Sequence, residues 1–267
     1  MKTKSYISLS RVGIIESVQF RVSTYVTFIG NLLYLIIIFF LWKAIYSSVG
    51  SDVVNGMTFY DTIIYLTLAS AISSFVESYV VWEMGDNIRT GKIVLDLLKP
   101  MKYIYYLFWT FSGRYAIHFF NRFLPTFILV YFVTHGTLTF GINILWFIVS
   151  ILFSVLINFS IDFITGTICL YTESIWGINI MKQVIVTLFS GAMIPIPFFP
   201  ESLRKIVNYL PFQAIYNLPL KVLLNSSVDL EDLLHIILIQ LFWIVVLFII
   251  SNYFWKASIK IITVNGG

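Results

Sequence analysis

The fold is decided by the stretch from Gly191 to Pro219, which reads GAMIPIPFFPESLRKIVNYLPFQAIYNLP. It ends a hydrophobic run long enough to enter a bilayer, and it holds five of the seven prolines in the chain. Pro195, Pro197 and Pro200 each remove a backbone donor and fix φ, so a regular helix does not run through them. The sequence therefore predicts a broken backbone where a membrane helix would otherwise continue or stop.

The residues between Pro200 and Pro211 have the pattern of a short amphipathic helix, because apolar side chains recur at helical spacing opposite a polar face. The apolar set is Leu203, Ile206, Val207 and Leu210, and the polar set is Glu201, Arg204, Lys205 and Asn208. We expect this helix to lie at the membrane surface or to dip into it. Broken backbone at membrane depth must be buried by protein or line a cavity. An ordinary external loop with a proline-rich start fits the composition equally well.

Composition assigns the whole chain to a membrane. Apolar residues make up 59% of the 267 residues and charged residues only 11%, with a mean hydropathy of +0.90. A soluble domain has about 25% charged residues, so this chain has too little polar surface to dissolve. We expect a single transmembrane domain over residues 1–267, without a cleaved signal peptide. The lone cysteine, Cys169, lies in an apolar run and is interpreted as a packing residue.

Hydrophobic runs predict an all-α integral membrane protein, because an apolar stretch of about 20 residues crosses the hydrocarbon core as a helix. Six spans are expected, at residues 23–42, 61–82, 111–134, 141–171, 174–194 and 235–255. Asp229 and Asp232 precede the sixth span as a candidate N-cap and its third-position partner. Placing both termini in the cytoplasm puts most Lys and Arg residues on the inner side, so the proline-rich segment should face outward.

Two segments outside the spans have mixed character. The N-terminal stretch 6–20 reads either as an interfacial helix against the inner leaflet or as an irregular lead-in. The loop MGDNIRTGKIVLDLLKP, Met84 to Pro100, mixes charged residues with six aliphatic ones. Gly91 allows a sharp turn between two short helices, and Pro100 ends the second. The aliphatic residues suggest packing into a groove of another protein or under the chain's own helices, or else contact with lipid headgroups.

The loop ending in GKI…LLKP, followed by GAMIPIPFFP…LPF…P, resembles the type-2 exporter family of ATP-binding-cassette (ABC) permeases. The resemblance covers essentially the whole chain and rests on the order and spacing of degenerate motifs. It implies ABC ATPase partners that bind ATP and Mg, and a second permease subunit, identical or related. It implies a coupling helix that docks on the ATPase, at Asp86, Asn87, Ile88, Arg89 and Gly91. It also implies an outer gate formed by a re-entrant segment, at Pro195, Pro197, Phe198, Phe199, Pro200, Leu203, Ile206 and Leu210.

Catalytic motifs are missing from the sequence. There is no GxxxxGK[ST] run to hold ATP phosphates, no HExxH and no paired-cysteine motif. We therefore expect a permease subunit in the cell membrane that is not itself an enzyme and that binds no cofactor or metal.

Five charged residues fall inside the predicted spans, namely Glu77, Arg114, Arg122, Asp162 and Lys182. A charge at the bilayer centre costs about 2.5–3.5 kcal/mol, so such residues usually face a cavity or a partner. Arg122 and Asp162 sit deeper than a generic family member requires. We expect Asp162 to pair with Arg122 or Arg114, as a bridge that fixes two helices in preference to a substrate site. The other charges are expected to reach the inner interface.

The leading hypothesis is the transmembrane subunit of an ATP-driven exporter, with an amphipathic or lipid-like cargo. A secondary transporter would usually show interrupted helices in both halves, whereas the proline breaks occur in one half only. An intramembrane enzyme would need a clustered His, Asp or Ser constellation, and a channel would need a repeated pore-lining segment. Neither pattern is visible. A co-purifying ATPase would separate the exporter from these alternatives.

Overall fold

The computed structural model describes residues 2–19, 21–77, 79–133, 143–172, 174–224 and 229–262. The long elements in these ranges are all helices. The strands found there, β1 (Val53–Val54) and β2 (Met57–Thr58), pair antiparallel in a small hairpin. Its turn is Asn55-Gly56, with φ of 51° and 82°, the left-handed geometry that a two-residue hairpin requires. The all-α prediction is thus confirmed apart from this hairpin.

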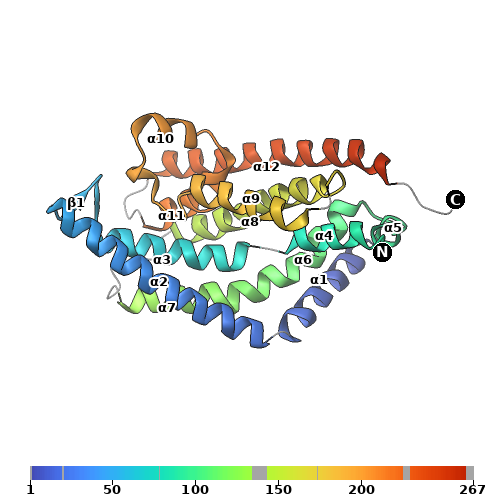
Figure 1. The fold of residues 1–267 in the computed structure, drawn as a ribbon, viewed down its shortest axis with the longest axis horizontal. Coiled ribbons are helices and arrows are strands. Elements are labelled where there is room, and N and C mark those ends of the chain that lie inside the picture. Colours follow the sequence, from blue (N-terminus) through green and yellow to red (C-terminus); the bar gives the residue numbers. More distant parts are fainter. Residues whose placement is uncertain are drawn as a thin grey trace.

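The long helices run broadly along the length of the molecule (Figure 1). Among the described residues, four helical stretches are long and apolar enough to cross a membrane, at Ile29–Val49, Phe59–Arg89, Asn143–Ile168 and Leu230–Ile261. They belong to α2 (Arg21–Val49), α3 with α4 (Phe59–Val76 and Val80–Arg89), α8 (Asn143–Ile168) and α12 (Leu230–Ser258). A shorter apolar helix, α9, covers Ile175–Phe189. This composition and helix content confirm an all-α membrane protein.

The predicted third span is part of a longer helical rod. It begins at Tyr103 as α6 (Tyr103–His118), passes through a π-helical turn (Phe119–Phe123) and continues as α7 (Leu124–Val133). Pro125 has no amide hydrogen to donate to the carbonyl four residues earlier. The Leu124 amide donates to the carbonyl of Phe119, five residues earlier, which is the hydrogen bond of a π-helical turn. Residue 134, where the predicted third span ends, and residues 141–142, where the predicted fourth begins, lie outside the described residues.

Helix α8 forms the centre of the core and contacts α12, α4 and the short helix α11 (Asn217–Leu224). Its buried face carries a polar stripe at a spacing of four residues, formed by Ser150, Ser154, Asn158 and Asp162, each at most 3% exposed. Cys169 is buried near the end of α8, as predicted. Helix α12 begins directly after Asp229, the predicted N-cap, although the Asp229 side chain makes no capping hydrogen bond.

The N-terminal stretch is helical, as α1 (Lys2–Gln19), and it packs closely against α6. Gly13 and Gly113 lie at the crossing, where an added Cβ on Gly13 would overlap the carbonyl of Thr110 and one on Gly113 would overlap that of Ser10. Small residues at a helix crossing let two backbones approach. The irregular lead-in is therefore excluded.

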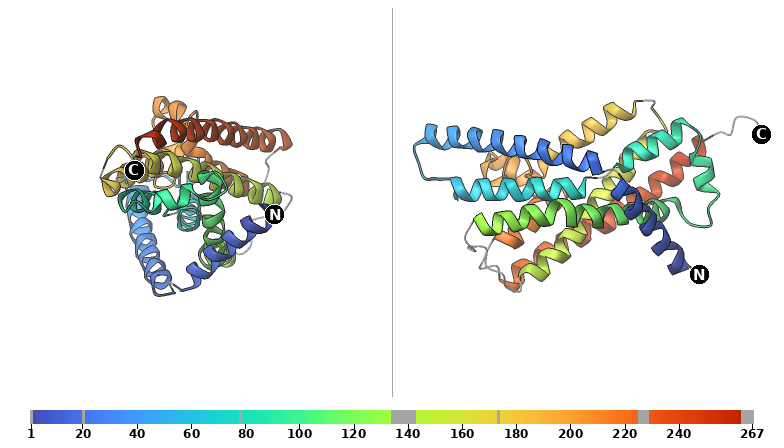
Figure 2. Two further views of the ribbon diagram at one scale, coloured as in Figure 1. Left: turned by 90° about the vertical axis from the view of Figure 1, so that its right-hand side faces the viewer. Right: turned by 90° about the horizontal axis from the view of Figure 1, so that it is seen from below.

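Two groups of short elements lie at opposite ends of the molecule. Helices α4 and α5 (Ile93–Leu97) lie at the end where α12 finishes (Figures 1 and 2). The β-hairpin and α10 (Glu201–Val207) lie at the other end. The two segments that the sequence singles out are thus separated by the length of the helices.

Candidate functional site

The predicted second span, 61–82, is not one continuous helix. Helix α3 ends at Val76, Glu77 is extended, and α4 begins at Val80. A helix end inside a membrane leaves carbonyl groups without partners, and these must be satisfied by protein. Arg122 Nη1 donates to the carbonyl of Ser74 at 3.0 Å, and Asn158 Nδ2 donates to the carbonyl of Val76 at 3.1 Å. Side chains from two other helices therefore stabilise the break.

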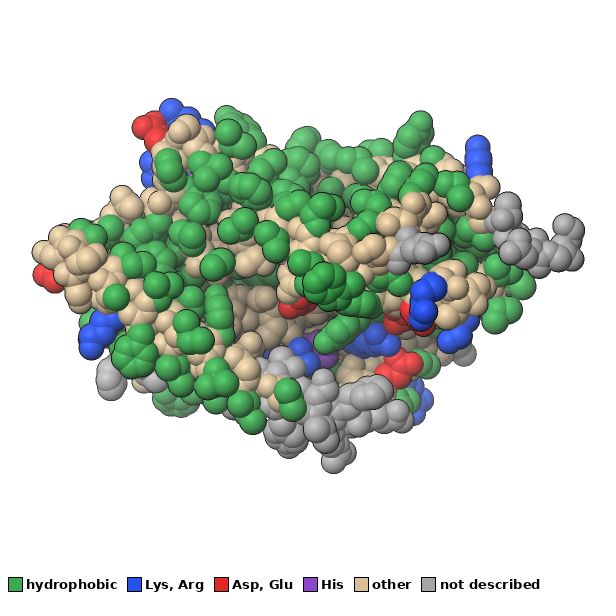
Figure 3. Space-filling view, viewed as in Figure 1, with side chains coloured by type: hydrophobic (Ala, Val, Ile, Leu, Met, Phe, Trp, Pro, Cys, Tyr) green, Lys and Arg blue, Asp and Glu red, His purple; other side chains and the backbone are tan. Residues whose placement is uncertain are grey.

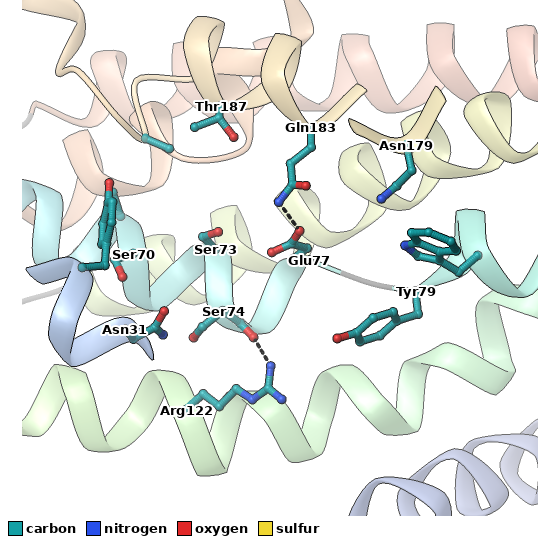
Figure 4. Close-up of a pocket in the computed structure, with 14 residues that line it drawn as sticks. Asn31, Ser70, Ser73, Ser74, Glu77, Tyr79, Arg122, Asn179, Gln183 and Thr187 are labelled. Atoms are coloured by element: carbon teal, nitrogen blue, oxygen red, sulfur yellow. Dashed lines mark hydrogen bonds between the residues drawn. The ribbon is translucent and has the colours of Figure 1, made fainter. Parts of the chain in front are cut away.

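A cavity of about 340 Å³ lies beside this break (Figure 4). Helices α2, α3, α4, α9 and the π-helical turn all contribute to its lining. The lining residues are Asn31, Tyr34, Ala69, Ser70, Ser73, Ser74, Glu77, Tyr79, Trp82, Arg122, Asn179, Gln183, Thr187 and Ala192. Half or more of these side chains are polar, within helices that are otherwise strongly apolar. Such a cavity can hold a polar group at membrane depth.

Glu77 and Arg122 are the charged residues of this cavity. Gln183 Nε2 on α9 donates to Glu77 Oε1 at 2.7 Å, across the cavity from Arg122. The Arg122 guanidinium reaches the Ser74 carbonyl from the opposite wall (Figure 4). Among the described residues, neither charged group forms an ion pair. The prediction that Arg122 faces a cavity or a partner is therefore supported, but its partner is a backbone carbonyl.

The expected pairing of Asp162 with Arg122 or Arg114 is wrong. Asp162 Oδ1 pairs with Lys182 Nζ at 2.9 Å, and Asn158 Nδ2 donates to Asp162 Oδ2 at 3.2 Å. Asp162 is fully buried and the Lys182 side chain is 9% exposed. Lys182 therefore does not reach the interface, contrary to expectation, because α8 turns Asp162 towards α9. This buried pair joins the two helices.

Arg114 was also expected to reach the inner interface, but its side chain instead joins three helices through two ion pairs. Its Nη2 lies 2.6 Å from Glu16 Oε2 on α1, and its Nη1 lies 3.2 Å from Glu83 Oε2 on α4. Ser10 and Ser112 share a hydrogen bond of 2.6 Å on the same crossing. Helix α1 is therefore linked through α6 to α4.

The predicted coupling segment has the expected form of two short helices with a turn. Asp86, Asn87, Ile88 and Arg89 lie in the second half of α4, and Gly91 follows with a φ of 72°. Arg89 pairs with Asp86 at 3.0 Å on the exposed face. Helix α5 is held to α4 by a hydrogen bond of 3.3 Å from Asn87 Nδ2 to Asp96 Oδ2. The segment is thus a folded unit and not a flexible loop.

The aliphatic residues of this segment divide into two sets. Ile93 is buried, and Ile88, Val94 and Leu97 are half-buried against the chain's own core. Leu95 and Leu98 are 65% and 77% exposed. Lys99 Nζ pairs with Asp96 at 2.7 Å. Partial burial lowers the pKa of Lys99, but its contacts with Asp96 and Tyr106 outweigh this and raise the pKa above its ordinary value. The exposed leucines make this end of the molecule a candidate docking surface.

The proline-rich segment forms a series of short helices. Pro195 precedes a 3₁₀ turn (Ile196–Phe198) that includes Pro197, and Phe199 and Pro200 lead into α10. Phe198 packs against Trp42 of α2, with ring centroids 4.6 Å apart. Leu210 precedes a second 3₁₀ turn (Pro211–Ala214), which leads to α11. The short helix bracketed by prolines is therefore confirmed.

Helix α10 was expected to pack against the outer ends of the spans, but a later part of the proline-rich segment packs on the long helices instead. In α10, Leu203 is half-buried, Ile206 is 58% exposed and only Val207 is fully buried. Charged side chains gather at α10, at the upper left of the space-filling view, whereas hydrophobic side chains cover most of that face (Figure 3). The buried part is the second 3₁₀ turn with α11. Its Ala214 carbonyl accepts hydrogen bonds from Ser154 Oγ at 3.1 Å and Gln240 Nε2 at 2.9 Å.

Several residues of the site escaped the sequence reasoning. Asn158, Gln183 and Gln240 were not singled out, and Glu77 was not assigned to a cavity. One pattern points to the first of these, because polar residues recur every four positions in the otherwise apolar α8. In a membrane helix such a stripe marks the face that packs on protein. No comparable pattern points to Gln183.

Comparison with known families agrees with this architecture. A family model described as "ABC-2 family transporter protein" matches residues 32–266. The matched range includes the α4–α5 segment, the whole proline-rich segment and all lining residues of the cavity except Asn31. A search of curated proteins found no match. Since the family model covers most of the chain, the protein belongs to the ABC-2 family, the membrane permeases of type-2 ABC transporters.

Proposed function

We propose that the chain is the transmembrane subunit of an ATP-driven exporter and supplies half of its translocation pathway. It would cross the membrane six times with both termini in the cytoplasm, and it would pair with a second permease subunit, identical or related. ABC ATPase subunits would bind ATP and Mg and would dock at the α4–α5 segment. The observation that carries the proposal is the family match over residues 32–266, which includes this segment.

The geometry supports a route from the docking surface to the pathway. Helix α4 begins at the break after Glu77 and ends in the α4–α5 segment, so one short helix joins the cavity to the exposed leucines. Closure of the ATPases would displace α4–α5, and the break would let α4 move relative to α3. The Arg114 bridge would carry the same movement to α1. At the other end, the proline-rich segment would close or open the exit.

Co-purification tests this proposal. The chain, extracted in mild detergent, should carry with it a subunit that hydrolyses ATP. Leu98→Asp should reduce that association by roughly tenfold, because it places a charge in a desolvated apolar contact. Leu98 is 77% exposed, so the substitution should leave the fold of the permease intact. Ile88→Asp is a weaker test, since Ile88 packs partly on the chain's own core.

The matched control is Leu234→Asp on α12, where Leu234 is 45% exposed and lies outside the α4–α5 segment. It should retain the ATPase. An intact permease that never co-purifies with an ATP-hydrolysing subunit would contradict the proposal.

A further inference from the structure

The cavity beside the break holds two charged side chains, Glu77 and Arg122, and no side chain of the described ranges forms an ion pair with either of them. Elsewhere at membrane depth, ionic side chains pair with each other, as Asp162 does with Lys182 at 2.9 Å. Glu77 instead receives the neutral Gln183 amide at 2.7 Å, and Arg122 donates to the Ser74 carbonyl at 3.0 Å. The Arg122 Nε atom is buried without a hydrogen-bond partner. Since an uncompensated charge in the membrane is costly, both groups are suited to a charged ligand.

The surroundings differ at the two charges. Tyr79, directly before α4, and Trp82 of α4 also line the cavity, and the Tyr79 hydroxyl end points toward the space between Glu77 and Arg122 (Figure 4). A carboxylate beside aromatic rings suits an ammonium group. A guanidinium suits a phosphate or a carboxylate, to which it can donate two hydrogen bonds. The serines of α3 and the amide of Asn31 add neutral donors near Arg122.

We propose that this cavity binds a zwitterionic group carried by an amphipathic molecule, with its ammonium at Glu77 and its anionic part at Arg122. A ligand with only a positive charge would leave the Arg122 guanidinium without a counter-charge. A ligand with only a negative charge would leave the Glu77 carboxylate without one. The cavity of about 340 Å³ is within the range of about 300–1,000 Å³ that ligand pockets occupy. On α9, Val184 and Leu188 directly follow the lining residues Gln183 and Thr187 and are 50% and 40% exposed, so an attached apolar chain would have apolar side chains beside the cavity to contact. Assigning this molecule as cargo rests on the proposed function, whereas its binding does not.

A binding assay with matched probes tests the inference. The full chain, purified in an uncharged sugar detergent, is titrated with dodecylphosphocholine, dodecyltrimethylammonium and dodecyl phosphate, and binding is followed by native mass spectrometry. Dodecylphosphocholine should bind at least ~10-fold more tightly than either single-charge probe, because its phosphate accepts charge-assisted hydrogen bonds from Arg122 while its trimethylammonium is attracted to Glu77 and the aromatic rings. Equal binding of the three probes would overturn the inference.

Tail-free phosphocholine separates the two sources of such a group. Binding comparable to that of the tailed probe would identify a soluble zwitterion, and binding of the tailed probe alone would identify a membrane lipid. Either result supports the zwitterion site, and the first would overturn its attachment to an amphipathic molecule. Tighter binding of a single-charge probe contradicts it.

Substitutions then assign the two charges. Glu77→Gln should weaken dodecylphosphocholine and dodecyltrimethylammonium by roughly tenfold and leave dodecyl phosphate unchanged. Arg122→Gln should weaken the two phosphate-bearing probes, and if its loss of the Ser74 contact prevents folding, Glu77→Gln decides alone. The control Glu231→Gln changes an exposed carboxylate on α12 and should alter nothing. Unchanged binding in Glu77→Gln would refute the site. No ATPase is needed, so that result would leave the proposed exporter function standing.

Discussion

At the residue scale, the polar stripe of α8 determines how that helix faces its neighbours. Ser154 donates to the Ala214 carbonyl in the proline-rich segment, Asn158 to the Val76 carbonyl at the break, and Asp162 pairs with Lys182 on α9. Each contact satisfies a group whose burial without a partner would be costly. A rotation of α8 about its axis would break all of them together. The stripe therefore fixes the packing of three elements.

The buried pair gives the first prediction. Asp162→Asn should destabilise the protein by about 3–5 kcal/mol, because it leaves the Lys182 ammonium buried without a counter-charge. Adding Lys182→Met should restore part of that loss. Thermal unfolding in detergent, run as a double-mutant cycle, would measure the coupling. Asp162→Asn with Arg114→Gln is the control cycle, since those two side chains have separate partners, and its effects should add. Additive effects of Asp162→Asn and Lys182→Met would contradict the pair.

Residue partners of this kind could not be predicted from the sequence. Counting along the spans gives the depth of Arg122 and Asp162 in the membrane, but not the direction in which each side chain points. The polar stripe of α8 indicates which face of that helix packs on protein, but not which helix lies opposite Asp162. The acceptor of Arg122, the Ser74 carbonyl, is free only because α3 ends at Val76.

At the element scale, the crossing of α1 and α6 depends on two glycines, which gives the second prediction. Gly113→Val should push α1 away, because the added side chain would overlap the Ser10 carbonyl. Cysteines at Ser10 and Ser112, whose hydroxyls lie 2.6 Å apart, should form a disulfide in a Cys169→Ser background. Gly113→Val should abolish this cross-link. Gly30→Val, on α2 with no atom within 4 Å of the added Cβ, should preserve it. Cross-linking that survives Gly113→Val would refute the close crossing.

The third prediction concerns α10. Ile206 is 58% exposed and its neighbour Val207 is fully buried, so adjacent positions should differ in access to water. A membrane-impermeant thiol reagent should label cysteine at 206 rapidly and at 207 slowly, again without Cys169. Leu203 and Arg204 are both half-buried and would not discriminate. Rapid labelling at both 206 and 207 would indicate an unfolded loop.

Whether a short element could be predicted from the sequence depended on the residues at its ends. The turn at Gly91 was predicted, because glycine and charged residues interrupt an aliphatic run there. The sequence analysis assigned no helix to the residues of the buried helix α11, which include Pro219. Pro219 lies in the first turn of α11, where a missing amide hydrogen costs little. The end of α3 at Val76 was missed because the run is apolar on both sides of Glu77.

At the scale of the whole molecule, the α4–α5 segment, the break between α3 and α4, and α10 of the proline-rich segment follow one another along its length (Figure 1), and the cavity lies beside that break. Helix α4 is part of the α4–α5 segment, and its Trp82 lines the cavity. Its Glu83 pairs with Arg114 of α6, which also pairs with Glu16 of α1. A movement imposed on α4–α5 would therefore reach the cavity through one short helix. This arrangement supports the proposed coupling between a cytoplasmic ATPase and the cavity.

The central claim is that an ATP-binding chain docks on the exposed leucines of this segment, and site-specific photo-cross-linking tests it most directly. A photoreactive amino acid at position 98 should trap a separate chain in native membranes, and mass spectrometry of the product should find a Walker-type phosphate-binding sequence in it. The same group at Leu234, 45% exposed on α12, should not trap that chain. Cross-linking at position 98 to lipid alone, with the permease intact, would contradict the account.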